Sequence, residues 1–139
     1  MTLPIVHADA SAVAAAIEHA RAAWPAEICG LIGGRDHRLE TTVPVANIAE
    51  PPPGQCGFHM DPTGQFRATR DLEDQGLDIT GVYHSHPHSA PVPSAQDIAL
   101  AVDPELTHLI IATGEGEPEL AAWRITDDAA TQVTLHTDR

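Results

Sequence analysis

The sequence predicts a mixed α/β domain built from about six strands and three helices. Short runs such as residues 107–112 have the length and apolar character of buried strands. Longer segments such as residues 9–23 carry apolar side chains at helical spacing. A chain of 139 residues is long enough to bury a real core, and we expect residues 1–139 to form a single domain.

The first elements are bounded by proline and glycine. Residues 4–7 form a short extended segment, and residues 9–23 form a helix that a Trp-Pro pair ends. Residues 27–32 are typical of a buried strand closed by a Gly-Gly turn, and a second strand covers about residues 38–47. Glu27 therefore lies at the start of a strand, where the backbone would hold it firmly.

The second half of the chain continues the mixture of strands and helices. A Pro-Pro-Pro-Gly run at residues 51–54 forms a loop rather than a domain linker, because neither side is long enough to stand alone. Gly76 ends a polar helix, and an Asp-Pro pair ends the helix after it. The predicted elements are an extended segment at 58–62, helices at 62–75 and 94–102, and strands at 79–86, 107–112, 119–126 and 130–136.

The charge balance argues against two classes of partner. Seven Lys and Arg face twenty Asp and Glu, which gives a formal net charge of −13. An acidic chain without a basic run offers nothing to the phosphates of nucleic acid or to an anionic membrane surface. No apolar run is long enough to span a bilayer, and the first residues lack the basic start and apolar core of a signal peptide. We therefore expect a cytoplasmic protein that binds neither nucleic acid nor membrane.

One stretch, residues 83–97, combines residues that could bind a metal. His84 and His86 are two apart in a predicted strand and so share a face. Proline cannot continue a central strand, so the chain leaves the sheet at Pro87 and returns through a loop to Asp97, one turn into a helix. Two histidines and a carboxylate are a zinc ligand set, and three protein ligands leave a fourth position for water, as in catalytic sites.

The spacing resembles that of a known family. His-x-His-Pro, six residues and Ser-x-x-Asp, with a glutamate far upstream, is similar to the pattern of the JAMM (MPN-domain) zinc metallopeptidases. The resemblance implies one curved mixed sheet flanked by three helices, an MPN/JAB1-like (cytidine-deaminase-like) fold. It also implies one Zn²⁺ per chain held by His84, His86 and Asp97, with Glu27 as general base and then acid, and Ser94 as a donor to the oxyanion.

Simpler interpretations exist for each of these residues alone. Ser94 and Asp97 also match a helix capping pattern, which is compatible with metal binding because a cap would aim Asp97. The same serine hydroxyl would then have to serve both as a cap and as a donor. The two histidines could be ordinary strand residues, and Glu27 a solvated carboxylate. Their joint occurrence favours the enzyme.

The resemblance also implies a substrate class. Members of the family cleave amide or isopeptide bonds beside the C-terminus of ubiquitin or ubiquitin-like proteins, and this chain is similar to the compact prokaryotic type that acts on sulfur-carrier proteins. We expect hydrolysis after a C-terminal Gly-Gly, with the tail lying along an exposed edge near residues 48–60. The alternatives are a zinc peptidase for small or cell-wall peptides and a non-catalytic MPN scaffold. A monomer and a homodimer are both compatible.

The remaining cysteines and histidines carry weaker expectations. Cys29 and Cys56 show no CxxC spacing and so no disulfide framework; Cys29 is expected in the core, and Cys56 as an exposed thiol or, alternatively, near the metal. Ser85 faces away from the two histidines, and the direction of His88 is open. The other histidines show no ligand spacing, and one of them is expected to be buried and hydrogen-bonded because it lies in an apolar strand, His108.

Overall fold

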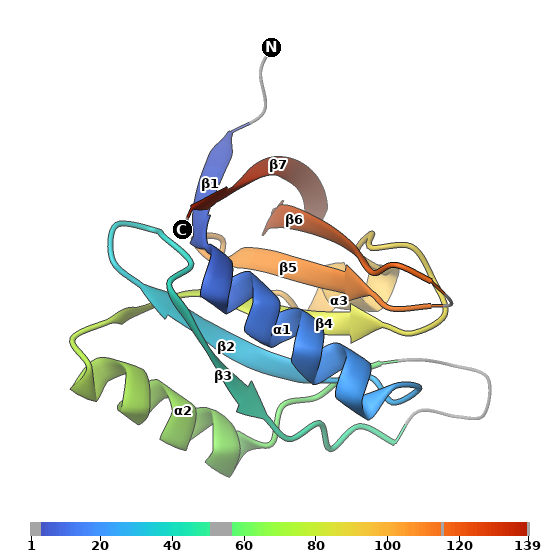
Figure 1. The fold of residues 1–139 in the computed structure, drawn as a ribbon, viewed down its shortest axis with the longest axis horizontal. Coiled ribbons are helices and arrows are strands. Elements are labelled where there is room, and N and C mark those ends of the chain that lie inside the picture. Colours follow the sequence, from blue (N-terminus) through green and yellow to red (C-terminus); the bar gives the residue numbers. More distant parts are fainter. Residues whose placement is uncertain (1–3, 51–56, 115, 139) are drawn as a thin grey trace.

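The computed structural model describes residues 4–50, 57–114 and 116–138 and confirms the mixed α/β class (Figure 1). Within these residues, seven strands and three helices follow one another. They are β1 (Ile5–Asp9), α1 (Ala10–Ala23), β2 (Cys29–Gly34), β3 (Thr41–Val45), α2 (Pro62–Asp74), β4 (Asp78–His86), α3 (Ala95–Leu100), β5 (Thr107–Ala112), β6 (Glu119–Thr126) and β7 (Ala129–Asp138).

All seven strands form one mixed sheet in the order β1-β7-β6-β5-β4-β2-β3. Strands β4 and β5 are parallel, as are β1 and β7, and the other neighbours are antiparallel. The sequence predicted about six strands because residues 4–7 were expected only to be extended. They pair with β7 and add a seventh strand, which lies beside it at one end of the sheet (Figure 1).

Each face of the sheet has its own apolar core, because successive side chains of a strand point to opposite faces. Helix α1 packs on one face and α2 on the other, over β2 and β3. In β4, Tyr83 belongs to the α1 face, where a Cβ at Gly30 would overlap its ring and its hydroxyl lies 2.8 Å from Nδ1 of His19. The side chains of Val82 and His84 therefore belong to the α2 face.

Several predicted boundaries differ from the observed ones. Strand β2 begins two residues after Glu27, and β3 is shorter than the predicted 38–47. As the edge strand of the sheet, β3 accommodates Pro44, which has no N–H to donate. Cys29 is buried as expected, and burial raises the pKa of its thiol to about 12. Cys56 lies outside the described residues.

None of the helices in the described part of the chain is both long and apolar enough to cross a membrane.

Candidate metal centre

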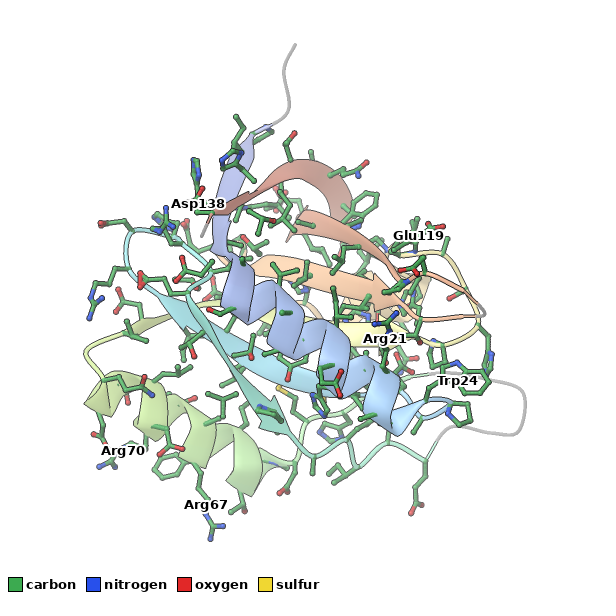
Figure 2. All side chains as sticks on the ribbon, in the orientation of Figure 1. Arg21, Trp24, Arg67, Arg70, Glu119 and Asp138 are labelled. Atoms are coloured by element: carbon green, nitrogen blue, oxygen red, sulfur yellow. The ribbon has the colours of Figure 1, made fainter. Side chains whose placement is uncertain are left out.

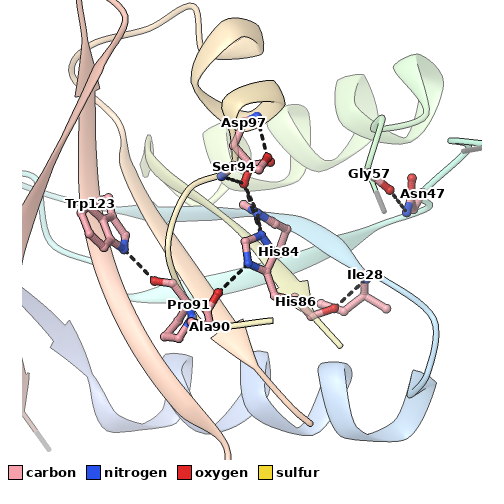
Figure 3. Close-up of polar contacts among 11 residues, drawn as sticks. Ile28, Asn47, Gly57, His84, His86, Ala90, Pro91, Ser94, Asp97 and Trp123 are labelled. Atoms are coloured by element: carbon pink, nitrogen blue, oxygen red, sulfur yellow. Dashed lines mark hydrogen bonds and ion pairs between the residues drawn. The ribbon is translucent and has the colours of Figure 1, made fainter. Parts of the chain in front are cut away.

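The end of β4 and the first turn of α3 bring three predicted ligands together (Figure 3). The Nε2 atoms of His84 and His86 are 3.1 Å apart. Each lies 3.2 Å from Oδ2 of Asp97. All three side chains are at most 8% exposed. We call His84, His86 and Asp97 the buried cluster.

The triangle formed by these three atoms has the size that a zinc ion requires. Zinc binds imidazole nitrogen and carboxylate oxygen at about 2.0–2.2 Å, so tetrahedral ligand atoms lie about 3.3 Å from one another. The edges of the triangle are 3.1 to 3.2 Å. The residues present therefore fit a tetrahedral ion with one position left for water.

Neighbouring groups set the orientation of both imidazoles. Nδ1 of His86 lies 2.9 Å from the carbonyl oxygen of Ala90, which can only accept a hydrogen bond. Nδ1 therefore carries the hydrogen, and Nε2 presents its lone pair to the centre of the cluster. The ring of His84 stacks on Phe58 with centroids 4.4 Å apart and an interplanar angle of 25°.

A capping box holds Asp97. The Ser94 hydroxyl accepts a hydrogen bond from the Asp97 amide at 3.0 Å, and Oδ2 of Asp97 accepts one from the Ser94 amide at 2.9 Å. Burial by itself would raise the pKa of Asp97, but the neighbouring imidazoles of His84 and His86 outweigh burial and hold that pKa well below its usual range. Asp97 is therefore a carboxylate at neutral pH.

Two tryptophans hold the loop at residues 87–93, and sequence reasoning gave neither of them a role in this loop. The indole N–H of Trp24 donates to the carbonyl of Pro87 at 3.4 Å. The indole N–H of Trp123 donates to the carbonyl of Pro91 at 2.9 Å (Figure 3). The indole N–H of a tryptophan that packs on the protein usually finds such a partner, but the sequence does not say which one.

Glu27 lies next to the buried cluster. A carboxylate oxygen of Glu27 and one nitrogen each of His84 and His86 all lie within 4.8 Å of one another. Oε2 is buried and has no hydrogen-bond partner among the residues that the structure describes. Burial raises the pKa of Glu27, although the neighbouring His84 and a backbone hydrogen bond from Gly57 oppose the rise.

The backbone around Glu27 is fixed from two sides. Ser85 points away from the two histidines, as the strand alternation predicted, and its hydroxyl accepts from the Ile28 amide at 3.0 Å. The Ser85 amide donates to the Ile28 carbonyl at 3.1 Å. On the other side, the side-chain Nδ2 of Asn47 donates to the Glu27 carbonyl at 3.0 Å and to the Gly57 carbonyl at 3.4 Å.

Asn47 is a residue whose importance the sequence did not reveal. Besides donating to Glu27, its Oδ1 accepts from the amides of Ala49 at 3.0 Å and His59 at 2.9 Å. One side chain therefore joins three segments beside the site. An asparagine at the end of a predicted strand, just before a Pro-Gly loop, was the available signal, but it is also ordinary turn chemistry.

Comparison with known proteins gives the family of this chain. Residues 9–126 match the family described as prokaryotic homologs of the JAB domain. The chain belongs to this family. This chain is 30% identical to the CysO-cysteine peptidase of Mycobacterium tuberculosis over 134 aligned residues. The alignment covers 94% of this chain and 90% of that protein.

Two further relatives agree with the JAB-domain assignment. The desampylase of Haloferax volcanii is 41% identical over 88 residues, or 62% of each chain. The crystal structure of AF2198, a JAB1/MPN domain protein from Archaeoglobus fulgidus, superposes with a TM-score of 0.63 at 18% identity, covering 99% of this chain and 100% of that one. That likeness confirms the predicted MPN-type fold, and the names peptidase and desampylase show that hydrolases occur in this family.

Two other histidines of the JAB domain lie outside the buried cluster. His88 is exposed and faces the ring of Trp24, with centroids 6.1 Å apart. His108 is buried as expected, and burial lowers its pKa to about 4. The expected hydrogen bond is not seen at Nε2 of His108, which has no partner among residues 4–50, 57–114 and 116–138.

A pocket of about 330 Å³ opens beside Asp97 and His84. His108 lines it together with other polar residues, among them His59, Gln65, Gln96 and Asp103. Most of the other walls are apolar side chains from the segment before α2, from β4, and from α3 and the residues after it: Phe58, Met60, Val82, Leu100, Val102 and Leu106.

Proposed function

We propose that this chain is a zinc-dependent hydrolase that cleaves an amide or isopeptide bond after the C-terminal Gly-Gly of a ubiquitin-like, sulfur-carrier-type protein. The observation that carries the proposal is the buried cluster, whose three ligand atoms have the spacing of a tetrahedral zinc site with Glu27 directly beside it. On this proposal residues 1–139 act as one domain with one catalytic zinc.

Glu27 is the proposed general base. Zinc bound by His84, His86 and Asp97 would polarise a water molecule and lower its pKa towards 7. The buried Oε2 of Glu27, which has no hydrogen-bond partner among the described residues, would accept the proton of that water and deliver it afterwards to the leaving amine. Its raised pKa suits both steps, because a carboxyl with a higher pKa is a stronger base.

Ser94 is the proposed donor to the oxyanion. A hydroxyl has one hydrogen to donate and two lone pairs that accept. The Ser94 oxygen uses one lone pair to accept from the Asp97 amide, so its hydrogen stays available for the substrate carbonyl oxygen. The cap and the catalytic role are therefore compatible in one group.

The relatives' names support the substrate class. One is a CysO-cysteine peptidase that aligns over 94% of this chain, and the other is a desampylase. An extended tail needs a partner segment with accessible main-chain groups. The segment around Met60, which is extended, pairs with Asn47 and lines the pocket, is where we place the tail.

The test compares two substrates and one variant. A folded β-grasp protein ending in Gly-Gly, joined by an amide bond to a terminal cysteine, is incubated with the zinc-loaded chain. A short peptide with the same last residues is assayed in parallel. We expect the folded substrate to be cleaved with a much higher kcat/KM. The Glu27→Gln variant should retain zinc and lose about 10²–10⁴-fold in kcat.

Other outcomes would assign the alternatives. Equal kcat/KM for the peptide and the folded protein would favour a general zinc peptidase. Zinc binding without cleavage of either substrate would favour a non-catalytic scaffold. Full activity in Glu27→Gln would remove the proposed base.

A further inference from the structure

A second group of two histidines and an aspartate lies at the other end of the sheet. Strands β1 and β7 are parallel, and their register places His7 directly beside His136. Asp138 is two residues further along β7 and therefore on the same face of the strand. We call His7, His136 and Asp138 the edge cluster. Strands β6 and β5 separate β7 from β4 and the buried cluster. Figure 2 labels Asp138 at this end of the molecule.

We propose that the edge cluster is a second metal site, which takes a divalent transition-metal ion such as zinc. One ligand atom from each of the three side chains lies within 4.8 Å of the other two. Nε2 of His136 is 3.1 Å from Oδ1 of Asp138, close to the spacing of about 3.3 Å between tetrahedral zinc ligands. Nδ1 of His7 is 3.8 Å from Oδ2, the other oxygen of the same carboxylate, and the exposed His7 imidazole can rotate towards the centre of the cluster.

The charges around the edge cluster favour a cation, although an arginine is part of the surroundings. Nη2 of Arg38 donates to Oδ2 of Asp138 at 2.7 Å and to Oδ1 of Asp9 at 3.1 Å. Two carboxylates share one guanidinium, so one negative charge remains when the histidines are neutral. The hydrogen bond from Arg38 also lowers the pKa of Asp138, which keeps it ionised, and it fixes the carboxylate with Oδ1 turned to His136.

The donor set selects the kind of ion. Imidazole nitrogens suit zinc, nickel and copper, whereas magnesium and calcium require oxygen ligands, of which this cluster offers one carboxylate. An exposed site with three protein ligands has room for water in its remaining positions. The ion would join the strand nearest the N-terminus to the strand nearest the C-terminus. Among the named strands of the described residues, β1 pairs with β7 alone, and on its other side it forms a single bridge to Leu39, so the ion would stabilise the terminal strand of the sheet.

The test counts zinc in variants by native mass spectrometry and titration calorimetry. We expect two zinc ions in the wild type, and one each in His86→Ala and His136→Ala. The double variant should bind none. His37→Asn is the matched control, because His37 is an exposed histidine outside both clusters whose left-handed backbone (φ 63°) asparagine tolerates. That control should bind two.

A second measurement reports on the strand itself. In His86→Ala, zinc should slow amide hydrogen exchange over residues 5–9 and raise the Tm by several degrees, and both effects should disappear when His136 or His7 is also replaced by alanine. Both edge histidines are exposed, so these variants should fold.

The outcomes separate this proposal from the catalytic one. One zinc in the wild type, retained in His136→Ala and lost in His86→Ala, would overturn the edge site and leave the catalytic site standing. One zinc that is lost only in His136→Ala would support the edge site and overturn zinc binding at the buried cluster. Two zinc ions in both His86→Ala and His136→Ala would also overturn the assignment of a zinc ion to the edge cluster.

Discussion

The buried cluster and the edge cluster contain the same donors, two imidazoles and one carboxylate, in very different surroundings. The side chains of the buried cluster are between 1% and 8% exposed, and those of the edge cluster between 29% and 60%. Water can satisfy the edge donors when no ion is bound. The buried donors have largely lost that alternative, so leaving them without an ion is costly. Burial, rather than ligand identity, distinguishes the two sites.

The two clusters also differ in how their ligands are held. In the buried cluster a main-chain carbonyl fixes the tautomer of His86, and a capping box fixes Asp97. In the edge cluster the carboxylate is fixed by Arg38, and both imidazoles are largely exposed. Orientation set in advance favours catalysis, because reacting groups must be held within a fraction of an ångström. The edge cluster meets the weaker requirements of a stabilising ion.

The largest effect that we predict comes from removing one histidine from each cluster in turn. His86→Ala should abolish hydrolysis of the folded Gly-Gly substrate, because it removes a proposed zinc ligand and leaves Asp97 without one of its partners. His136→Ala should retain wild-type kcat and KM. The measurement is a steady-state assay on both variants at saturating zinc. Comparable loss of activity in His136→Ala would show that the edge cluster also affects the reaction. The distinction between a catalytic and a stabilising cluster would then be wrong.

Replacing Ser94 separates its two roles beside the buried cluster, the cap that holds Asp97 and the proposed donor to the oxyanion. Ser94→Ala should lower kcat by about 10²–10³-fold through the lost oxyanion donor, and should lower the free energy of unfolding by about 1 kcal/mol through the lost cap. Ser94→Asp is the matched variant: it keeps an acceptor for the Asp97 amide but has no hydrogen to donate. We expect it to recover stability, measured by urea unfolding, but not kcat. Recovery of both would reduce Ser94 to a cap.

His108 provides a third case, a buried histidine without a carboxylate partner. Burial lowers its pKa to about 4, whereas an unfolded histidine has a pKa of about 6.5. Between these values the unfolded chain binds one more proton than the folded chain, so the free energy of unfolding falls as the pH falls from about 6.5 to about 4. The loss should be on the order of 3 kcal/mol.

The measurement for His108 is urea unfolding of metal-free protein across that pH range. His108→Gln should have a shallower pH dependence than the wild type, whereas His37→Asn should not differ from it. A wild-type curve and a His108→Gln curve that run parallel would mean that His108 becomes charged without cost, against its burial.

The sequence predicted the parts of the molecule that depend on local spacing. Alternation along a strand placed His84 and His86 on one face and Ser85 on the other, and the capping pattern placed Asp97 one turn into α3. Contacts between distant segments were not predictable in this way. The edge cluster joins residues 7 and 136, which approach only because β1 pairs in parallel with β7. Residues 4–7 were expected to be extended, but their sequence does not indicate which strand they pair with.

The smallest predicted effect concerns Asn47, which holds the segment carrying Glu27 and has no counterpart at the edge cluster. Asn47→Ala removes the hydrogen bond to the Glu27 carbonyl and should lower kcat by about 10–100-fold, as loss of a supporting contact typically does. Zinc stoichiometry should not change, because no hydrogen bond joins Asn47 to the buried cluster among the described residues. Asn47→Asp is the informative partner variant, since a carboxylate still accepts from the amides of Ala49 and His59 but cannot donate to Glu27.

If the donated bond positions the base, Asn47→Asp should lose as much kcat as Asn47→Ala while keeping more of the free energy of unfolding. The pattern expected of a merely structural residue is different, with kcat and stability recovering together in Asn47→Asp. Because KM depends on the pocket and on the segment around Met60, a rise in KM at constant kcat would instead assign Asn47 to the placement of the substrate tail. The split between kcat and KM therefore decides whether the buried cluster depends on Asn47 through Glu27 or through its substrate.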